Sequence, residues 1–288
     1  MARKKSGFFG SLWRAVTWAV SWSLRLFYLA ARLLFRWFSS VLGFVGRKAE
    51  NAKRLASRPS SLSTDIPFGL LSSRKGNLAA FEEKLYSNKS TIGLVLGSRG
   101  SGKSALGLRL LENIAAKKKR SVYAMGFDEA TLPAWIFCSK ELGSLPNGAF
   151  VLVDEGGIAF SSRQSMSGAN KLLSSLILIA RHKDISVLFI SQNSANLEIN
   201  AIRQADYLLL RKPSLLQIDF ERKKIGEIYG RIAGGFDQLP EEGKHSTYIY
   251  SDEFEGYVSN KLPSFWSQAV SKSFASFKAK GRGQKRRE

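Results

Sequence analysis

Short apolar runs alternate with longer amphipathic stretches through the middle of the chain. The runs are rich in β-branched and aromatic residues and occupy 91–96, 121–125, 149–153, 187–191 and 207–210. A continuous apolar run of this length is typical of a strand that is buried on both faces. Amphipathic stretches predict helices at 105–116, 169–180, 199–203 and 220–232, and 247–251 predicts a further strand at an edge. Strands that alternate with helices indicate an α/β fold with a mostly parallel, doubly wound sheet.

A different pattern fills residues 8–46. This segment is apolar and aromatic, holds four of the six tryptophans, and contains no proline or acidic residue. Its arginines recur at helical spacing, so on a helix they would fall within one stripe roughly 60° wide. They are Arg14, Arg25, Arg32, Arg36 and Arg47. The pattern predicts an N-terminal hydrophobic, basic helix over 1–48.

The composition of this helix bears on how it would meet a membrane. Its longest uncharged run has ten residues, 15–24, whereas about 20 apolar residues are needed to cross a bilayer. A signal peptide fits poorly, because no clean apolar core with a small-residue cleavage site precedes the arginines. The arginine stripe and the tryptophans favour a helix lying in, or tilted into, an anionic membrane surface. Packing against other proteins, such as a capsid shell or further copies of the chain, and disorder are the alternatives.

Positive charge is concentrated at the two ends of the chain. Residues 1–58 hold twelve Lys and Arg against one acidic residue, and 270–288 hold seven against one. The polar stretch 49–65 predicts a linker, and 66–269 is long enough for one globular domain with a full core. The flexible basic tail at 270–288 suits phosphate backbones or anionic lipid equally well, or only aids solubility.

Cysteine and histidine usage argues against two kinds of site. Cys138 is the only cysteine in the chain, so an internal disulfide is excluded and nothing demands an oxidising compartment. His182 and His245 have no Cys/His spacing around them, and a structural zinc site is therefore not predicted.

Residues 97–104 match the phosphate-loop pattern GxxxxGK[ST]. The loop and the residue after it are Gly97, Ser98, Arg99, Gly100, Ser101, Gly102, Lys103, Ser104 and Ala105. The pattern follows the apolar run 91–96 and opens the helix at 105–116, which is the strand–loop–helix context that it requires. Glycines let backbone N–H groups turn inward around a phosphate, and the helix N-terminus adds a positive dipole end. The sequence therefore predicts ATP binding at 97–105.

Polar residues that follow two other strands complete the predicted chemistry. Lys103 is expected to reach the β- and γ-phosphates, and Ser104 to bind Mg²⁺ together with Asp154, at the end of the run 149–153. The adjacent Glu155 is placed to polarise the attacking water. Gln192 follows the run 187–191, and it either senses the γ-phosphate and orients the water or merely caps the next turn.

The order of these elements resembles the additional-strand, catalytic-glutamate class of P-loop NTPases, which have a RecA-like fold. In that class a sensor strand lies between the phosphate-loop strand and the Asp-Glu strand. The resemblance therefore implies that 187–191 lies between 91–96 and 149–153 in the sheet.

Several short blocks resemble the zonular occludens toxin family, the assembly ATPases of filamentous phages within the FtsK/HerA superfamily of DNA-pumping motors. The blocks are Val151–Glu155, Ala180–His182, Ile190–Gln192 and Ile202–Asp206, within a resemblance that covers roughly residues 91–215. It implies nucleotide roles for Lys103, Ser104, Asp154, Glu155 and Gln192. In that family the membrane segment typically follows the ATPase domain, whereas here the hydrophobic segment comes first. Packaging into a membrane-containing virion therefore competes with filamentous extrusion.

The resemblance also implies a homo-oligomeric ring in which an arginine of one subunit completes its neighbour's site. Arg163, Arg203 and Arg211 are the candidates, and an ordinary surface or salt-bridged role is the alternative for each. The expected function is a membrane-associated ATPase that translocates or packages nucleic acid, with DNA as the expected form, in phage or archaeal virus assembly. It would act at the cytoplasmic face of the host membrane or inside a membrane-containing virion. A structural virion protein with a nucleotide-dependent switch and a protein-remodelling ATPase are the alternatives.

Overall fold

The computed structural model describes residues 58–118, 120–139, 142–155, 166–240 and 245–271, together with positions 13, 18, 22, 32, 35–40 and 56. The chain divides into two compact units, residues 1–57 and 58–288. In the first unit every described residue is helical, and the rings of Trp18 and Trp22 lie 5.7 Å apart. None of the helices described is both long enough and apolar enough to span a bilayer. Most of the predicted N-terminal helix and the basic tail lie outside the described residues.

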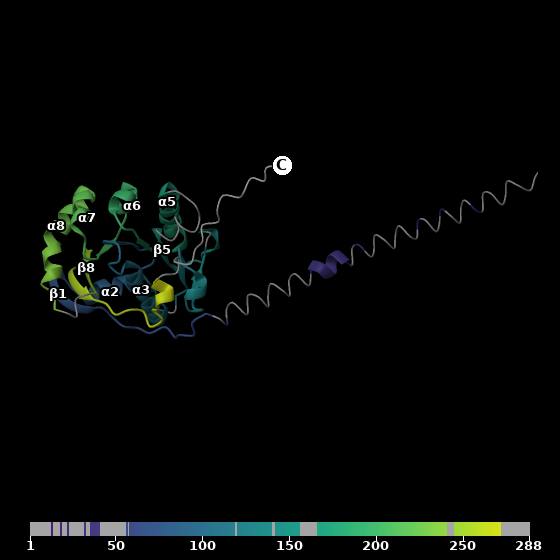
Figure 1. Ribbon diagram of the computed structural model, residues 1–288, viewed down its shortest axis with the longest axis horizontal. Helices are drawn as coiled ribbons and strands as arrows, with labels where there is room; N and C mark the ends of the chain where they lie inside the picture. Colours follow the sequence, from purple (N-terminus) through teal and green to yellow (C-terminus); the bar gives the residue numbers. More distant parts are fainter. Residues whose placement is uncertain are drawn as a thin grey trace, which may run out of the picture. The chain divides into compact units, whose positions relative to one another are not determined.

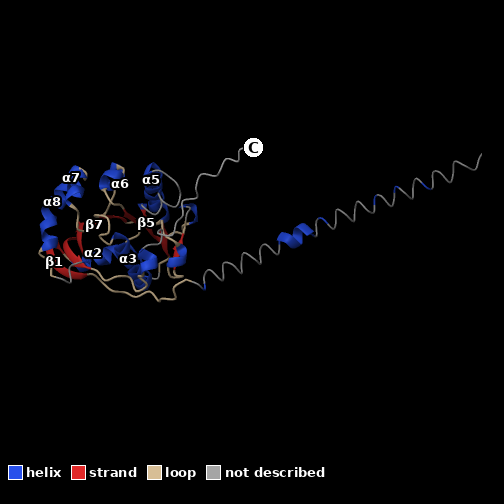
Figure 2. Ribbon diagram, viewed as in Figure 1, coloured by secondary structure: helices blue, strands red, loops and turns tan. Residues whose placement is uncertain are grey.

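The second unit is built on one mixed, mostly parallel sheet (Figures 1 and 2). Its nine described strands have the order β1-β9-β8-β7-β2-β6-β5-β3-β4. They are β1 (Gly69–Gly76), β2 (Ile92–Leu96), β3 (Val122–Met125), β4 (Ile136–Cys138), β5 (Phe150–Asp154), β6 (Ser186–Ile190), β7 (Tyr207–Leu210), β8 (Ser246–Ser251) and β9 (Phe254–Ser259). The strands from β7 to β4 are parallel to one another, and β8, β9 and β1 extend the sheet in antiparallel fashion. This is the predicted α/β fold.

The position of β6 confirms the strand order that the sequence implied. β6 pairs with β2 on one side and with β5 on the other. The expected edge strand at 247–251 is wrong in its position, however. It forms β8, which pairs with both β7 and β9, so the edge strand on that side of the described sheet is β1 instead.

Helices cover both faces of the sheet. They are α2 (Leu78–Ser87), α3 (Lys103–Lys118), α5 (Met166–Lys183), α6 (Ile199–Arg203), α7 (Leu215–Phe220), α8 (Lys223–Asp237) and α9 (Gln268–Ser271), with short 3-10 turns at Glu129–Thr131, Leu142–Ser144 and Ser194–Asn196. The α5, α6 and α8 side chains pack into one apolar core, and those of α2 and α3 pack into the other. Both cores include residues of the central parallel strands, which explains their continuous apolar runs.

The helix predicted at 220–232 is divided in the structure. Phe220 ends α7, and α8 begins at Lys223. The break lies where Glu221 accepts hydrogen bonds from the backbone N–H and the hydroxyl of Ser194. Arg222 donates to the Ser194 carbonyl at 3.0 Å. These contacts hold Glu221 and Arg222 in an extended conformation, so a helix with a favourable period cannot continue through them.

Residues 58–68, here called the N-terminal strap, belong to the second unit, although the predicted linker extends to residue 65. Arg58 is buried and donates to the carbonyls of Leu132, Pro133 and Ile136. Trp135 donates from Nε1 to the Ser61 carbonyl at 2.8 Å. Hydrogen bonds to buried backbone carbonyls fix a segment that has few apolar side chains of its own, so its polar composition resembles that of a linker.

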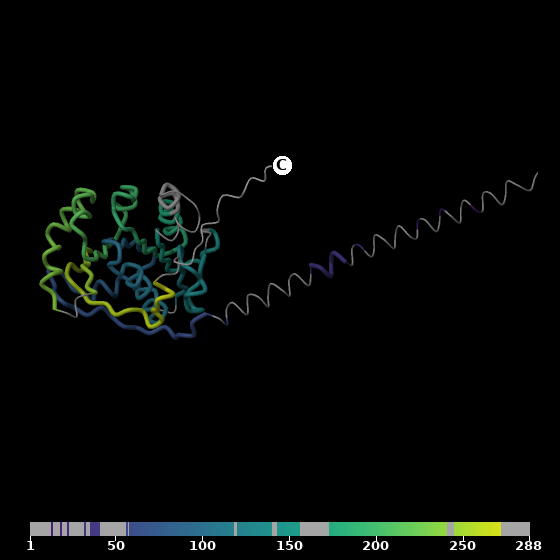
Figure 3. The backbone as a smooth tube through the Cα atoms, viewed as in Figure 1, coloured from purple at the N-terminus to yellow at the C-terminus, as the bar shows by residue number. Residues whose placement is uncertain are grey.

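The strap and the end of the domain meet on helix α3. Glu112 of α3 is fully buried and pairs with Arg109 at 2.8 Å. Its carboxylate also accepts hydrogen bonds from Thr64 of the strap and from Ser264 near the end of the described chain. Figure 3 shows the two chain segments running side by side, in blue and yellow. Helix α3, which follows the phosphate loop, therefore contacts segments near both ends of the domain.

Candidate active site

The phosphate loop lies between β2 and α3, as the motif predicts. Gly97 has φ 152° and Gly102 has φ 86°, and residues other than glycine rarely adopt such backbone conformations. A Cβ on Gly97 would lie 2.6 Å from Cβ of Arg211, so glycine is also required there by close packing. The hydroxyl of Ser101 is buried and has no hydrogen-bond partner in the described part of the chain. A buried, unpaired hydroxyl in this loop fits a site that receives a ligand with hydrogen-bonding oxygens.

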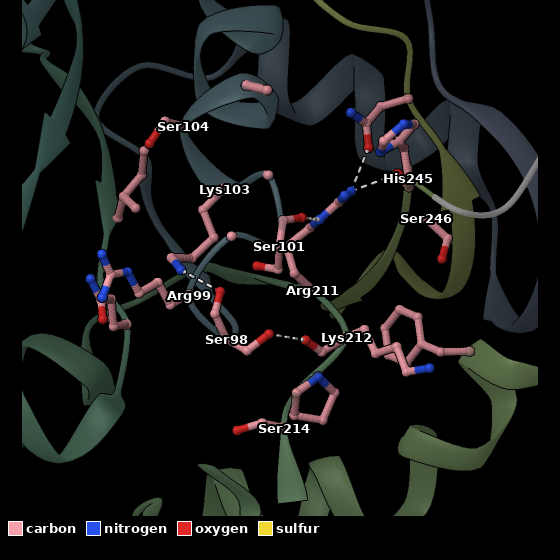
Figure 4. Close-up of a pocket in the computed structure, with 18 of the residues that line it drawn as sticks. Ser98, Arg99, Ser101, Lys103, Ser104, Arg211, Lys212, Ser214, His245 and Ser246 are labelled. Atoms are coloured by element: carbon pink, nitrogen blue, oxygen red, sulfur yellow. Dashed lines mark hydrogen bonds between the residues drawn. The ribbon is translucent and has the colours of Figure 1, made fainter. Parts of the chain in front are cut away.

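Lys103 is folded back onto the loop. Its Nζ donates to the carbonyls of Gly97 and Ser98 at 2.8 and 2.9 Å, and Figure 4 shows the bond to Ser98. Burial lowers the pKa of Lys103 to about 8, with the carboxylates of Asp154 and Glu155 acting in the opposite direction. A phosphate would compensate for that desolvation, because it brings negative charge to a buried ammonium.

Ser104 and Asp154 form the predicted pair of oxygen ligands. The Ser104 hydroxyl donates to Oδ2 of Asp154 at 2.9 Å, although the residues are 50 positions apart in the sequence. Mg²⁺ commonly takes one or two protein oxygens and completes its shell with water and phosphate oxygens. Among the described residues, no group of three or more His, Cys, Asp or Glu is placed so that it could hold a metal ion. The pair fits Mg²⁺ bound together with a nucleotide.

Glu155 lies next to Asp154 at the end of β5, and its side chain is buried. Burial is the main influence on its carboxyl group and raises its pKa, while a hydrogen bond from the Ser191 hydroxyl partly opposes that rise. Ser191 is the residue after β6, so the bond joins the ends of two neighbouring strands. The sequence did not predict that Ser191 binds Glu155, because nothing in the local pattern around a serine indicates which distant residue its hydroxyl contacts.

Gln192 lines a cleft that opens along the phosphate loop, and its side chain is exposed. The alternative that it caps the next turn is wrong, because Oδ1 of Asn193 accepts from the N–H of Ala195 and is the cap. The backbone carbonyl of Gln192 accepts a hydrogen bond at 2.9 Å from Nε2 of Gln217 on α7. A hydrogen bond from α7 therefore fixes the backbone at Gln192. The Gln192 side chain takes no part in that bond and lines the cleft.

The three candidate arginines have different surroundings. Arg163 lies outside the described residues. Arg203 is exposed at the end of α6 and does not line the cleft. Arg211 is only 3% exposed and is bound within its own subunit, so a role in a neighbour's site is wrong for Arg211. Its burial depends on contacts with β8 and with the loop after β9, which lie far along the chain.

A cleft of about 1060 Å³ opens along the phosphate loop. Lys103, Asp154 and Gln192 line it, and apolar side chains also contribute to the lining. The apolar lining includes Phe236, Leu239, Leu262 and Trp266. Ligand clefts commonly combine an apolar wall with a few convergent polar groups. The cleft can hold a nucleotide, with the phosphates at the loop.

Comparison with known proteins adds limited information. No family model matches the chain, and no curated protein matches it. Among solved structures, it is similar to B204, the DNA-packaging ATPase from Sulfolobus turreted icosahedral virus, at 14% identity over 60% of this chain and 99% of that chain, with a TM-score of 0.43. The genome-packaging NTPase B204 from Sulfolobus turreted icosahedral virus 2, in complex with ATP-γS, gives 13% identity over 60% and 98%, with a TM-score of 0.39.

A third similar structure is Thermomonospora curvata EccC (ATPases 2 and 3), at 13% identity over 66% of this chain and 42% of that chain, with a TM-score of 0.40. None of the three is described as a zonular occludens toxin protein, so that narrower resemblance stays a prediction. At TM-scores below 0.5 these similarities carry no argument for the function of the chain. That function has to be inferred from the geometry of the cleft and the sheet edge.

Proposed function

We propose that this chain binds MgATP in the cleft and hydrolyses it. One observation carries the proposal: groups from two segments, the phosphate loop and the end of β5, meet at one edge of the sheet. The Ser104 hydroxyl contacts Asp154, and the Lys103 ammonium is close enough to Asp154 and Glu155 for their charges to influence its pKa. A cation for the phosphates, oxygen ligands for Mg²⁺ and a carboxylate for the attacking water are what phosphoryl transfer to water requires.

The residues divide the work as follows. Lys103 exchanges its contacts with the Gly97 and Ser98 carbonyls for contacts with phosphate oxygens. Ser104 and Asp154 would hold Mg²⁺, which would neutralise phosphate charge. The Ser191 hydroxyl binds Oε2 of Glu155, which leaves Oε1 to accept a hydrogen bond from the attacking water. Burial makes the Glu155 carboxylate a stronger base, and this favours its accepting the water proton.

We propose further that hydrolysis drives the movement of nucleic acid, with DNA as the expected substrate, in a ring of identical subunits. The two basic ends of the chain support this, since they suit phosphate backbones. The aromatic, basic segment at 8–46 supports association with an anionic membrane surface. The corresponding locations are the cytoplasmic face of a host membrane and the interior of a membrane-containing virion.

The decisive measurement is the rate of ATP hydrolysis by the full chain, with and without Mg²⁺ and with single- or double-stranded DNA. We expect Mg²⁺-dependent hydrolysis that DNA accelerates, and we expect added salt to weaken the acceleration through counterion release. If the wild-type chain hydrolyses ATP no faster than Asp154→Asn does, the proposed ATPase activity is contradicted. An ATPase that ignores both forms of DNA at low salt would instead favour a nucleotide switch or a protein-remodelling enzyme.

A further inference from the structure

Arg211 directly follows β7, and its buried guanidinium joins three separate segments of the domain. Nε donates to the Ser101 carbonyl in the phosphate loop at 2.7 Å. Nη1 donates to the His245 carbonyl, to the hydroxyl of Thr247 on β8 at 3.0 Å, and to Oδ1 of Asn260 at 3.0 Å. Figure 4 shows the side chain extending between the loop and His245. Desolvation lowers the pKa of Arg211 to about 10, so the group stays charged at neutral pH.

The bond to Ser101 fixes the direction of one peptide unit in the loop. A trans peptide is planar, so the Ser101 carbonyl and the Gly102 N–H point in opposite directions. Because Arg211 holds the carbonyl, the Gly102 N–H points away from Arg211. Phosphate loops bind anions through N–H groups that face inward. If the Ser101 carbonyl faced inward in place of the Gly102 N–H, its oxygen would repel a phosphate.

The loop and the arginine are packed against each other without spare room. A Cβ on Gly97 would lie 2.6 Å from Cβ of Arg211, and one on Gly102 would lie 3.1 Å from Nη2. The two glycines therefore allow the loop to close onto the guanidinium. Lysine could not replace it, because an ammonium lacks the planar fork that reaches acceptors on several segments at once.

We propose that Arg211 is a positioning residue for the phosphate loop, which rests on the proposed function of the cleft as a nucleotide site. It keeps the Ser101 carbonyl on the outside of the loop and aims the Gly102 N–H into the anion cradle. Its bonds to β8 and Asn260 hold it in place while it does so. The cradle is thereby formed before the phosphate arrives, and preorganised donors bind an anion without the cost of rearranging.

The test compares binding of MgADP and of AMP to the full chain by calorimetry. ADP has the β-phosphate that the loop would bind, whereas AMP depends mainly on the rest of the cleft. The variants are Arg211→Lys, Arg211→Met and the control Arg58→Met. Arg58 is a suitable control because it is also buried and donates to three backbone carbonyls, but it does not line the cleft.

Both Arg211 variants are expected to lose about tenfold or more in ADP affinity. In them the Gly102 N–H is no longer held toward the charged β-phosphate, and a hydrogen bond to a charged group contributes at least a factor of about ten. AMP affinity should change little, and in steady-state kinetics KM for ATP should rise more than kcat falls. Arg58→Met should bind ADP as the wild type does, even if its melting temperature falls.

Wild-type ADP affinity in Arg211→Lys would overturn the inference. An equal loss for AMP and ADP would also overturn it, since that pattern indicates general distortion of the cleft. If circular dichroism shows that Arg211→Met does not fold, Arg211→Lys decides the question, because it retains the charge and most of the volume. A wild-type chain that binds neither ADP nor ATP would contradict the proposed function. Equal ADP binding by the wild type and Arg211→Lys would contradict only the role of Arg211.

Discussion

Lys103 and Glu155 are assigned to different steps, and single substitutions can separate them. Lys103→Ala removes the ammonium that is proposed to bind the phosphates, so nucleotide binding should be lost. Glu155→Gln preserves the shape of the side chain, so binding should persist while hydrolysis falls about a hundredfold or more, as expected for loss of a general base. ATP affinity and phosphate release at saturating MgATP are the measurements. Wild-type hydrolysis by Glu155→Gln would remove Glu155 from its assigned role.

Ser191 offers a test of how the environment of Glu155 is tuned. The Ser191 hydrogen bond lowers the pKa of Glu155, against the larger rise caused by burial. In Ser191→Ala that pKa should rise further, so the carboxylate is protonated at a higher pH and loses its function as a base there. The acidic limb of the single-turnover rate should therefore move to higher pH. Ser174→Ala, whose hydroxyl binds Glu198 at the surface, is the control, and an identical profile for wild type and Ser191→Ala would contradict the assignment.

Some site residues could be predicted from the sequence because local spacing encodes their chemistry. Lys103 and Ser104 belong to one loop motif, and Asp154 ends a strand whose place in the sheet follows from its apolar run. Arg211 is different. Its partners Ser101 and His245 are 110 and 34 positions away, and nothing near Arg211 indicates them. Only the antiparallel addition of β8 and β9 buries this arginine, so the sequence alone left it as a candidate for a neighbouring subunit.

At the scale of elements, the sequence predicted the strands whose side chains are buried on both faces. It missed β1, because Gly69–Gly76 is mostly exposed and has no apolar alternation. That strand exists through its pairing with β9, a partner almost 180 residues later. It also missed β4, which has only three residues and one fully buried side chain. Strands defined mainly by their neighbours leave little trace in the local pattern.

The N-terminal strap predicts where the chain can be shortened. A chain that begins at residue 49 keeps Arg58 and Thr64, whereas one that begins at residue 69 leaves Glu112 and Asn113 of α3 without their strap partners. We expect the first to melt cooperatively and to retain nucleotide binding. The second should be strongly destabilised, because buried polar groups that lose their partners carry a desolvation penalty.

Thermal melting followed by circular dichroism, in parallel with ADP binding, distinguishes the two truncations. Equal stability of both would mean that residues 58–68 contribute nothing to the fold. Failure of the chain that begins at residue 49 would instead place an essential element within residues 1–48.

At the scale of the whole molecule, the segment at 8–46 predicts a preference for anionic over neutral vesicles. Each basic residue near such a surface contributes about 1 kcal/mol, and the tryptophan side chains described there are exposed. Binding should shift their fluorescence to the blue as the rings enter the headgroup region. Cosedimentation and fluorescence of the full chain, with the chain that begins at residue 49 as control, measure this. A full chain that ignores anionic vesicles would refute the membrane assignment and favour protein packing.

The meeting of Thr64 and Ser264 on Glu112 has a consequence for avidity. Residues 1–58 carry a net charge of +11 and residues 270–288 carry +6. The first stretch ends six residues before Thr64, and the second begins six residues after Ser264. The two basic ends are thus attached within a few residues of chain from one shared contact in the domain. Toward an extended polyanion we expect them to act as the two arms of a bivalent ligand, because contact by one would raise the effective concentration of the other. Removing either arm should therefore weaken binding by more than the charge of that arm alone accounts for.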